Sequence, residues 1–263
     1  MTAQTVLVDR TDAVATIAFN DSERRNALTR QAKEALRSAI ADVACDAGVR
    51  AVVLAGAQGS FCVGQDLGEH ADALAEGAEA AFATVREHYT PMVSDLLTMP
   101  KPVIAAVTGT CVGAGLGLAL ACDYRVFAAG ARLGTAFTGI GLTFDSGLSF
   151  TLPRAVGDAR AKELILFSRG FTAEEGISWG IAGEVVAAAD VVARAVALAR
   201  QLAGGPTTAY AESKRLLLAS AALGLDAALE SEAIAQARCG GTADHAAAVT
   251  AFLKKQRPVF TGD

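Results

Sequence analysis

The chain has 263 residues, of which 52% are hydrophobic, and this length suits one large domain or one domain with a small appendage. Its net charge of −5 comes without any stripe of lysine or arginine, which argues against nucleic acid as the main partner. No apolar run reaches the ~18 residues of a membrane span, and no basic segment followed by an apolar one opens the chain. We therefore expect a cytoplasmic protein without a membrane partner.

The first half of the chain alternates predicted strands and helices. Residues 6–8 and 14–19 predict a hairpin, and Thr29 is a suitable N-cap for a helix over residues 30–45. A single long helix is expected over residues 71–98. Buried strands are expected over residues 51–55 and 103–107, and a third strand over residues 123–128. This alternation indicates an α/β fold built from β/α units with parallel pairing.

After residue 145 the pattern predicts helices only. They are expected near residues 146–155, 158–168, 173–179, 190–203, 206–222, 226–238 and 242–255. The last three are rich in alanine, and we expect them to pack on the core or on another subunit.

The cysteines and histidines give no sign of a disulfide framework or a metal site. The five cysteines are scattered, odd in number and without CxxC spacing, which indicates reduced thiols. The three histidines, His70, His88 and His245, lie far apart without ligand spacing, so we expect each at the surface. No metal and no redox cofactor are expected.

Two glycine-containing loops, residues 61–67 (FCVGQDL) and 109–117 (GTCVGAGLG), each follow an apolar run. Glycine lets a backbone approach a ligand closely, and a free N–H from each loop could grip one carbonyl oxygen from two sides. Such an oxyanion hole favours chemistry in which negative charge builds on that oxygen. The second loop lacks the G-x-G-x-x-G spacing of a dinucleotide site and a fitting acidic residue about 20 positions on, so we do not expect it to bind a dinucleotide.

With these loops, several further motifs make the chain resemble the crotonase superfamily, the enoyl-CoA hydratase/isomerase group. The motifs are RNAL at 25–28, PKPVI at 100–104, DSG at 145–147, LPR at 152–154 and PVFTG at 258–262. The resemblance implies a spiral of ββα units over residues 1–200 and a helical trimerisation segment over residues 201–263. It also implies an acyl-CoA thioester as ligand and a homotrimer or homohexamer as the assembly.

The resemblance also implies roles for particular positions. The backbone N–H groups of Val63 and Ala114 would form the oxyanion hole. Asp66 would either contact the coenzyme A or only shape its loop, and Arg24 and Arg25 stand where family members place a cation near the phosphates. The positions implied to bind substrate are Arg25, Ala27, Gln65, Asp66, Leu67 and Phe137. Coenzyme A is part of the substrate, so no separate cofactor is implied.

The carboxylates decide which reaction the resemblance supports. Hydratases of the family use two glutamates, and the corresponding positions here are Gly117 and Phe137, so both departures count against a hydratase. Asp145 is the only acidic residue between Asp123 and Asp158. One carboxylate suits a proton shuttle, which removes a proton at one carbon and returns it at another.

The segment around Asp145 resembles the ring-1,2-epoxyphenylacetyl-CoA isomerase branch. Phe144 and Leu148 replace the usual proline and glycine, which suggests a different acyl group. We therefore predict an enoyl-CoA isomerase with Asp145 as the catalytic carboxylate. The alternatives are a 2-enoyl-CoA hydratase that uses Asp145 alone and an acyl-CoA-binding protein with little catalysis. Asp145 could also be only the N-cap of the helix that follows it.

Overall fold

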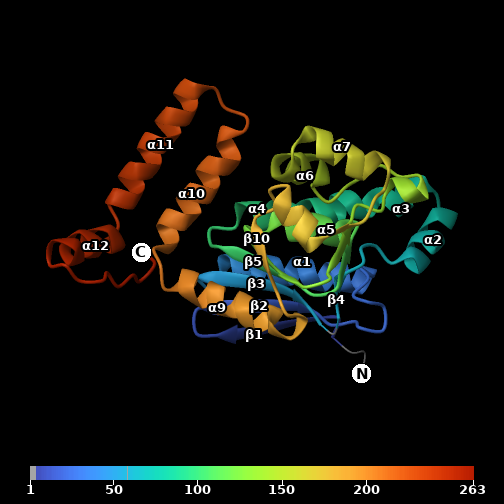
Figure 1. Ribbon diagram of the computed structural model, residues 1–263, viewed down its shortest axis with the longest axis horizontal. Coiled ribbons are helices and arrows are strands. Elements are labelled where there is room, and N and C mark those ends of the chain that lie inside the picture. The colour runs from blue at the N-terminus through green and yellow to red at the C-terminus, as the bar shows by residue number, and fades with distance from the viewer. Residues whose placement is uncertain (1–3, 58) are drawn as a thin grey trace.

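A computed structural model describes residues 4–57 and 59–263, and two β-sheets form its centre (Figure 1). The larger sheet has the order β1-β2-β3-β5-β7-β10. Its strands are β1 (Val6–Thr11), β2 (Val14–Phe19), β3 (Ala51–Gly56), β5 (Val103–Val107), β7 (Tyr124–Ala128) and β10 (Gly183–Val186). β1 and β2 form the predicted antiparallel hairpin, and the remaining neighbours pair in parallel.

The smaller sheet has the order β4-β6-β8-β9. Its strands are β4 (Ser60–Cys62), β6 (Thr110–Val112), β8 (Arg132–Gly134) and β9 (Phe171–Thr172). Along the chain, a strand of the larger sheet is followed by one of the smaller sheet and then by helix, as in β5, β6 and α5 (Ala114–Ala121). The expected spiral of ββα units is therefore confirmed.

Helices cover the sheets and close the core. The helix α1 (Arg30–Cys45) begins at Thr29, whose side chain accepts a hydrogen bond from Ala32 N, as the sequence predicts. It contacts β1 and β2, whereas α9 (Val191–Ala203) lies across β2, β3, β5 and β7. Within the described part of the chain, no helix is both long and apolar enough to cross a membrane.

The expected long helix over residues 71–98 is wrong. Four segments occupy this stretch: α2 (Leu67–Ala75), α3 (Ala78–Thr84), a π-helical turn η1 (Val85–Tyr89) and α4 (Thr90–Thr98). The break falls at Gly77, whose φ of 120° lies outside the helical region and suits only glycine. The π-helical turn widens the helix where it borders the candidate site.

The prediction of helices alone after residue 145 is also wrong, because β9 and β10 interrupt them. The helices themselves lie close to their expected positions. They are α6 (Leu148–Val156), α7 (Asp158–Leu166), α8 (Ala173–Ser178), α9, α10 (Thr207–Ser220), α11 (Leu225–Gly240) and α12 (Ala243–Leu253), with a short 3-10 turn η3 (Ala188–Asp190) before α9. A second 3-10 turn, η2 (Thr138–Ile140), precedes residue 145.

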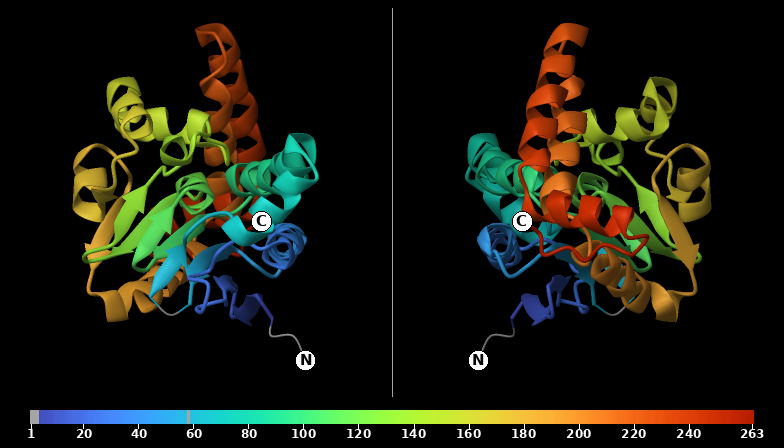
Figure 2. Two further views of the ribbon diagram at one scale, coloured as in Figure 1. Left: turned by 90° about the vertical axis from the view of Figure 1, so that its right-hand side faces the viewer. Right: turned by 90° about the vertical axis from the view of Figure 1, so that its left-hand side faces the viewer.

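The helices α10, α11 and α12 form an arm that extends from the rest of the molecule (Figure 2). Two cations fix its base. Lys214 Nζ on α10 lies 2.7 Å from Asp123 Oδ2 and 3.2 Å from the carbonyl oxygen of Lys101. Arg50 donates to Thr207 Oγ1 at 2.9 Å and to the carbonyl oxygen of Phe260 at 3.1 Å. The arm is thus anchored through α10, many of whose residues are half-buried, and is largely exposed along α11 and α12.

Candidate active site

A cavity of about 540 Å³ lies between the two glycine-containing loops, the helical segment from α2 to η1 and the loop that carries Asp145. All the positions predicted from the sequence line it: Arg25, Ala27, Val63, Gln65, Asp66, Leu67, Ala114, Phe137 and Asp145. The structure therefore brings together residues that are spread over more than a hundred positions of the chain.

Val63 and Ala114 both line this cavity, and neither backbone N–H group donates in a loop or turn hydrogen bond among the described residues. Val63 follows the end of β4, and Ala114 is the first residue of α5, so its N–H has no partner within the helix. The loops adjoin, since a Cβ atom at Gly64 would lie 3.2 Å from Ala114 N. The N-terminus of α5 adds partial positive charge beside Ala114. This arrangement is suited to an oxyanion.

Close packing around α5 explains why its residues are small. A Cβ atom at Gly115 would meet the carbonyl oxygen of Cys62 at 2.4 Å, and one at Gly117 would meet that of Ser146 at 2.4 Å. The helix therefore touches the first glycine loop on one side and the Asp145 loop on the other. Because Ser146 fills the space beside Gly117, no longer side chain fits there without moving this loop.

Asp145 lies half-buried in the turn before α6. Its Oδ1 accepts a hydrogen bond from Ser146 Oγ at 2.7 Å. Burial raises the pKa of Asp145, while the Ser146 hydrogen bond and the charge of Lys33 lower it. The net upward direction brings this carboxyl nearer to neutral pH, which suits a group that both takes and returns a proton.

The interpretation of Asp145 as a helix cap is wrong. The N-cap of α6 is Gly147, which makes no side-chain capping hydrogen bond, and Asp145 contributes only its backbone carbonyl, to Leu148 N. Ser146 and Gly147 both have positive φ, 51° and 75°. For the non-glycine residue Ser146 this conformation is strained, and such strain is often found at functional sites.

The motif over residues 25–28 holds the cavity mouth in place. Asn26 Nδ2 donates to the carbonyl oxygens of Ala57 at 3.1 Å and Ser60 at 2.8 Å, which ties this loop to the start of β4. Leu28 N donates to the carbonyl oxygen of Gly64 at 2.8 Å. The arginines Arg24 and Arg25 line the cavity and are exposed.

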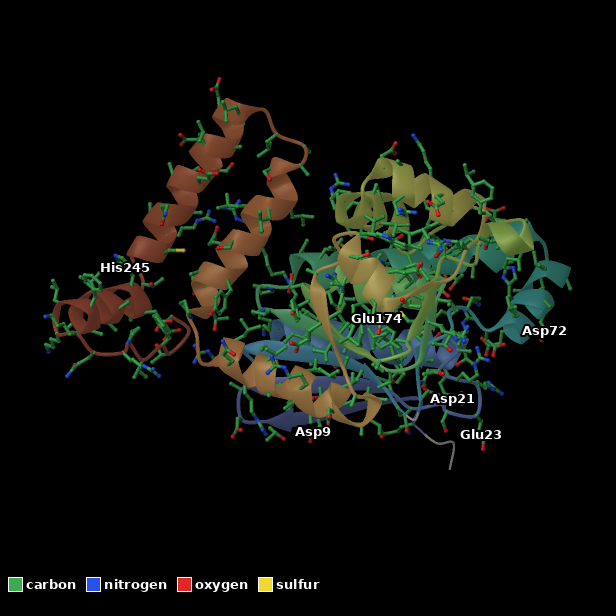
Figure 3. All side chains as sticks on the ribbon, in the orientation of Figure 1. Asp9, Asp21, Glu23, Asp72, Glu174 and His245 are labelled. Carbon is green, nitrogen blue, oxygen red and sulfur yellow. The ribbon has the colours of Figure 1, made fainter. Side chains whose placement is uncertain are left out.

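Asp66 has a structural role as the N-cap of α2. Its Oδ1 accepts a hydrogen bond from Glu69 N at 3.0 Å and so caps α2. Figure 3 places Asp21, Glu23 and Asp72 toward one end of the molecule, and Arg24 N donates to Asp21 Oδ1 at 3.2 Å. The arginines therefore stand among acidic neighbours and do not form a uniformly basic patch.

The histidines only partly match the expectation of surface positions. His245 lies on the arm, far from the cavity (Figure 3). His70 lines the cavity, and His88 is buried, with its Nδ1 3.1 Å from Thr84 Oγ1. Burial, and then the nearby charge of Lys33, lowers the pKa of His88. In the described part of the chain, no group of three or more His, Cys, Asp or Glu side chains is placed to hold a metal ion.

Sequence reasoning missed Tyr89 and Lys33. The Tyr89 side chain is buried in the cavity wall, and its hydroxyl donates to Gln65 Oε1. Lys33 Nζ donates to the same oxygen at 3.1 Å. One signal was available, because Lys33 stands three and seven residues before Leu36 and Ile40, on the buried face of the predicted helix.

Comparison with known proteins shows which family the chain is similar to. The family model described as enoyl-CoA hydratase/isomerase matches residues 9–263. A Rhodobacter capsulatus protein named as a probable enoyl-CoA hydratase is 38% identical over 262 residues, which is 100% of both chains. The 1,2-epoxyphenylacetyl-CoA isomerase of Escherichia coli is 36% identical over 249 residues, 95% of each chain.

Solved structures agree with this result. The crystal structure of a protein named as an enoyl-CoA hydratase/isomerase from Mycobacterium abscessus superposes with a TM-score of 0.94 at 46% identity, covering 98% of this chain and 100% of that one. The match of sequence and fold extends over nearly the whole chain. The chain belongs to the enoyl-CoA hydratase/isomerase family of the crotonase superfamily.

Proposed function

We propose that this protein is an acyl-CoA isomerase that moves a carbon–carbon double bond of an enoyl thioester. Asp145 removes a proton from C2 of a 3-enoyl-CoA, and the electron pair moves onto the thioester oxygen. The N–H groups of Val63 and Ala114 stabilise the resulting dienolate. Protonated Asp145 then returns its proton at C4, which leaves the double bond between C2 and C3. The step needs no metal or redox group.

The observation that carries this proposal is that Asp145 has no second free carboxylate beside it among the described residues that line the cavity. The carboxylates that line the cavity, among the described residues, are Asp66 and Asp145, and Asp66 is engaged as the cap of α2. At the two positions of the hydratase glutamates, Gly117 has no side chain and Phe137 has no proton to transfer. A single carboxylate fits a proton shuttle better than it fits the addition of water.

A 2-enoyl-CoA hydratase is the second candidate, because several relatives carry that name, including those from Rhodobacter capsulatus and Bacillus anthracis. In that reaction Asp145 alone would activate the water and supply the proton at C2. The third interpretation, a binding protein without efficient chemistry, follows from the missing glutamates alone.

One spectroscopic assay separates these candidates. Trans-3-hexenoyl-CoA and trans-2-hexenoyl-CoA are offered separately, and absorbance of the conjugated enone thioester is followed. We expect the 3-enoyl thioester to gain this band and the 2-enoyl thioester to keep it. Loss of the band from the 2-enoyl thioester, with no gain from the 3-enoyl one, would assign a hydratase. Calorimetric binding of both with no change in either spectrum would favour the binding protein.

A further inference from the structure

The side-chain amide of Gln65 is held by two donors on one atom. Lys33 Nζ, from α1, lies 3.1 Å from Gln65 Oε1, and the Tyr89 hydroxyl, from η1, donates to the same oxygen. Lys33 is 4% exposed and Tyr89 2%, so both contacts are formed away from bulk water. Thr84 Oγ1 accepts a further hydrogen bond from Lys33 at 2.8 Å and fixes the ammonium group.

These contacts determine which way the amide faces. An ammonium group has donors and no acceptor, so only the oxygen of an amide can face it. With Oε1 turned toward Lys33 and Tyr89, the NH₂ group of Gln65 must point elsewhere. Within residues 4–57 and 59–263 Gln65 Nε2 donates to no other group, yet it is not among the buried polar atoms that lack a partner. Its N–H groups therefore remain accessible, and Gln65 lines the cavity.

The position of Tyr89 indicates which part of a ligand this amide meets. The exposed arginines Arg24 and Arg25 mark the cavity mouth, whereas Tyr89 belongs to its buried wall. Gln65 stands two residues after Val63 and turns its side chain toward that wall. Burial is the main cause that raises the pKa of Tyr89, and the negative charge of Asp145 raises it further. Gln65, Tyr89 and Asp145 line the same cavity, so the amide borders the space that also holds the proposed catalytic carboxyl.

We infer that Gln65 is a specificity-determining residue that donates a hydrogen bond to an acceptor oxygen on the acyl group, with Lys33 as the residue that positions it. The substrate class is then an acyl-CoA whose acyl chain carries a carbonyl, ether or hydroxyl oxygen beyond the reacting carbons. This inference rests on the proposed function, which supplies the thioester. A hydrocarbon acyl group would cover the donors without satisfying them, and that selects against it.

Matched acyl-CoA thioesters test this selectivity by calorimetry. The probes are heptanoyl-CoA, 5-oxoheptanoyl-CoA and 6-oxoheptanoyl-CoA, which carry no double bond to move and differ by one acceptor-only ketone placed beyond the reacting carbons C2 to C4. We expect wild type to bind one oxo thioester about 2- to 13-fold more tightly than heptanoyl-CoA, the effect of one net hydrogen bond. Gln65→Met should abolish most of this preference, because it keeps the length and removes the donor.

Lys33 variants test the positioning role. Lys33→Met leaves Gln65 in place but frees its amide to turn, so the oxo preference should fall although Lys33 is not among the residues that line the cavity. Lys33→Arg keeps a donor-only cation and should retain part of the preference. Lys162→Met is the matched control, since Lys162 is an exposed lysine on α7 paired with Asp158. Circular dichroism and melting temperature establish that each variant is folded.

The outcomes separate this inference from the proposed function. If all three thioesters bind wild type equally, or if the oxo preference survives in Gln65→Met, the assignment of Gln65 is overturned while thioester binding stands. If the preference survives in Lys33→Met but disappears in Gln65→Met, the positioning role of Lys33 is overturned. If none of the thioesters binds, the proposed function fails and this inference fails with it.

Discussion

Single residues control the ionisation of the proposed catalytic carboxyl. The surroundings of Asp145 change its pKa in opposite directions: burial raises it, and the Ser146 hydroxyl and the charge of Lys33 lower it. A raised pKa means that the carboxyl becomes ionised, and so able to accept a proton, at a higher pH than an ordinary aspartate, which titrates near pH 3.9. The acidic limb of kcat/KM should therefore lie above that value.

Removal of the Lys33 charge should move this limb further. In Lys33→Met an influence that lowers the pKa of Asp145 is lost, so this pKa rises and the acidic limb shifts to higher pH. The measurement is kcat/KM for 3-hexenoyl-CoA across about pH 4 to 9, with Lys162→Met as control. A shift to lower pH, or an equal shift in the control, would contradict the coupling between Lys33 and Asp145.

Some residues of the candidate site could be predicted from the sequence, and others could not. Val63, Ala114 and Asp145 belong to motifs whose order along the chain is distinctive, and all three line one cavity. Lys33 and Tyr89 belong to no such motif. Their shared contact with Gln65 arises only when α1 packs against η1 and α4, and periodicity along one segment does not predict which side chain of another it meets.

Among the elements, α5 is the one that most constrains the site. Its small residues let it approach two loops at once, and the carbonyl oxygen of Ser146 would lie 2.4 Å from a Cβ atom at Gly117. Gly117→Ala would gain helix propensity of about 0.4–1 kcal/mol. The clash with backbone should outweigh this gain and destabilise the protein by about 1–3 kcal/mol, because the loop of Asp145 must shift.

Gly134→Ala provides the control, since a Cβ atom there has 3.6 Å to its nearest neighbour and the residue has no positive φ. Urea unfolding measures the free-energy difference, and isomerase turnover per folded molecule measures the displacement of Asp145. We expect Gly117→Ala to lower both the free energy of unfolding and the turnover. Gly134→Ala should leave both close to their wild-type values. Equal stability and turnover of the two variants would show that this contact does not position the loop.

Element prediction from sequence succeeded where a local signal was strong. Thr29 marks the start of α1, and the buried strands β3 and β5 are continuous apolar runs. The smaller sheet was missed, because its strands of two or three residues are too short to show a period of two. The break at Gly77 was missed because a single glycine is tolerated inside many helices.

At the scale of the whole molecule, the arm of α10, α11 and α12 exposes many large apolar side chains that no other part of the described chain covers. Its largest exposed apolar side chains include Leu217, Leu225, Phe252 and Leu253, with fractional exposures of 73–80%. Residues of this kind gathered on one projecting segment are typical of an interface between subunits. We therefore propose that the working form is a homotrimer or homohexamer, assembled through this arm.

Light scattering at micromolar concentration tests this assembly. Wild type should have several times the mass of one chain, and Phe252→Glu should shift the particle toward a single chain, because it places a charge in the buried contact. Val8→Glu is a control, since Val8 is an exposed apolar residue on β1, away from the arm. A wild-type monomer with full activity would refute the proposal.

The most direct test of the account is the turnover of trans-3-hexenoyl-CoA by Asp145→Asn. Asparagine keeps the size of the side chain but accepts no proton at neutral pH. We predict that isomerisation falls by about 10² or more, while thioester affinity changes little. Since burial raises the pKa of Asp145, its ionised form costs stability at neutral pH, and the melting temperature of the variant should not fall. Wild-type turnover in this variant would contradict the account and remove Asp145 from the mechanism.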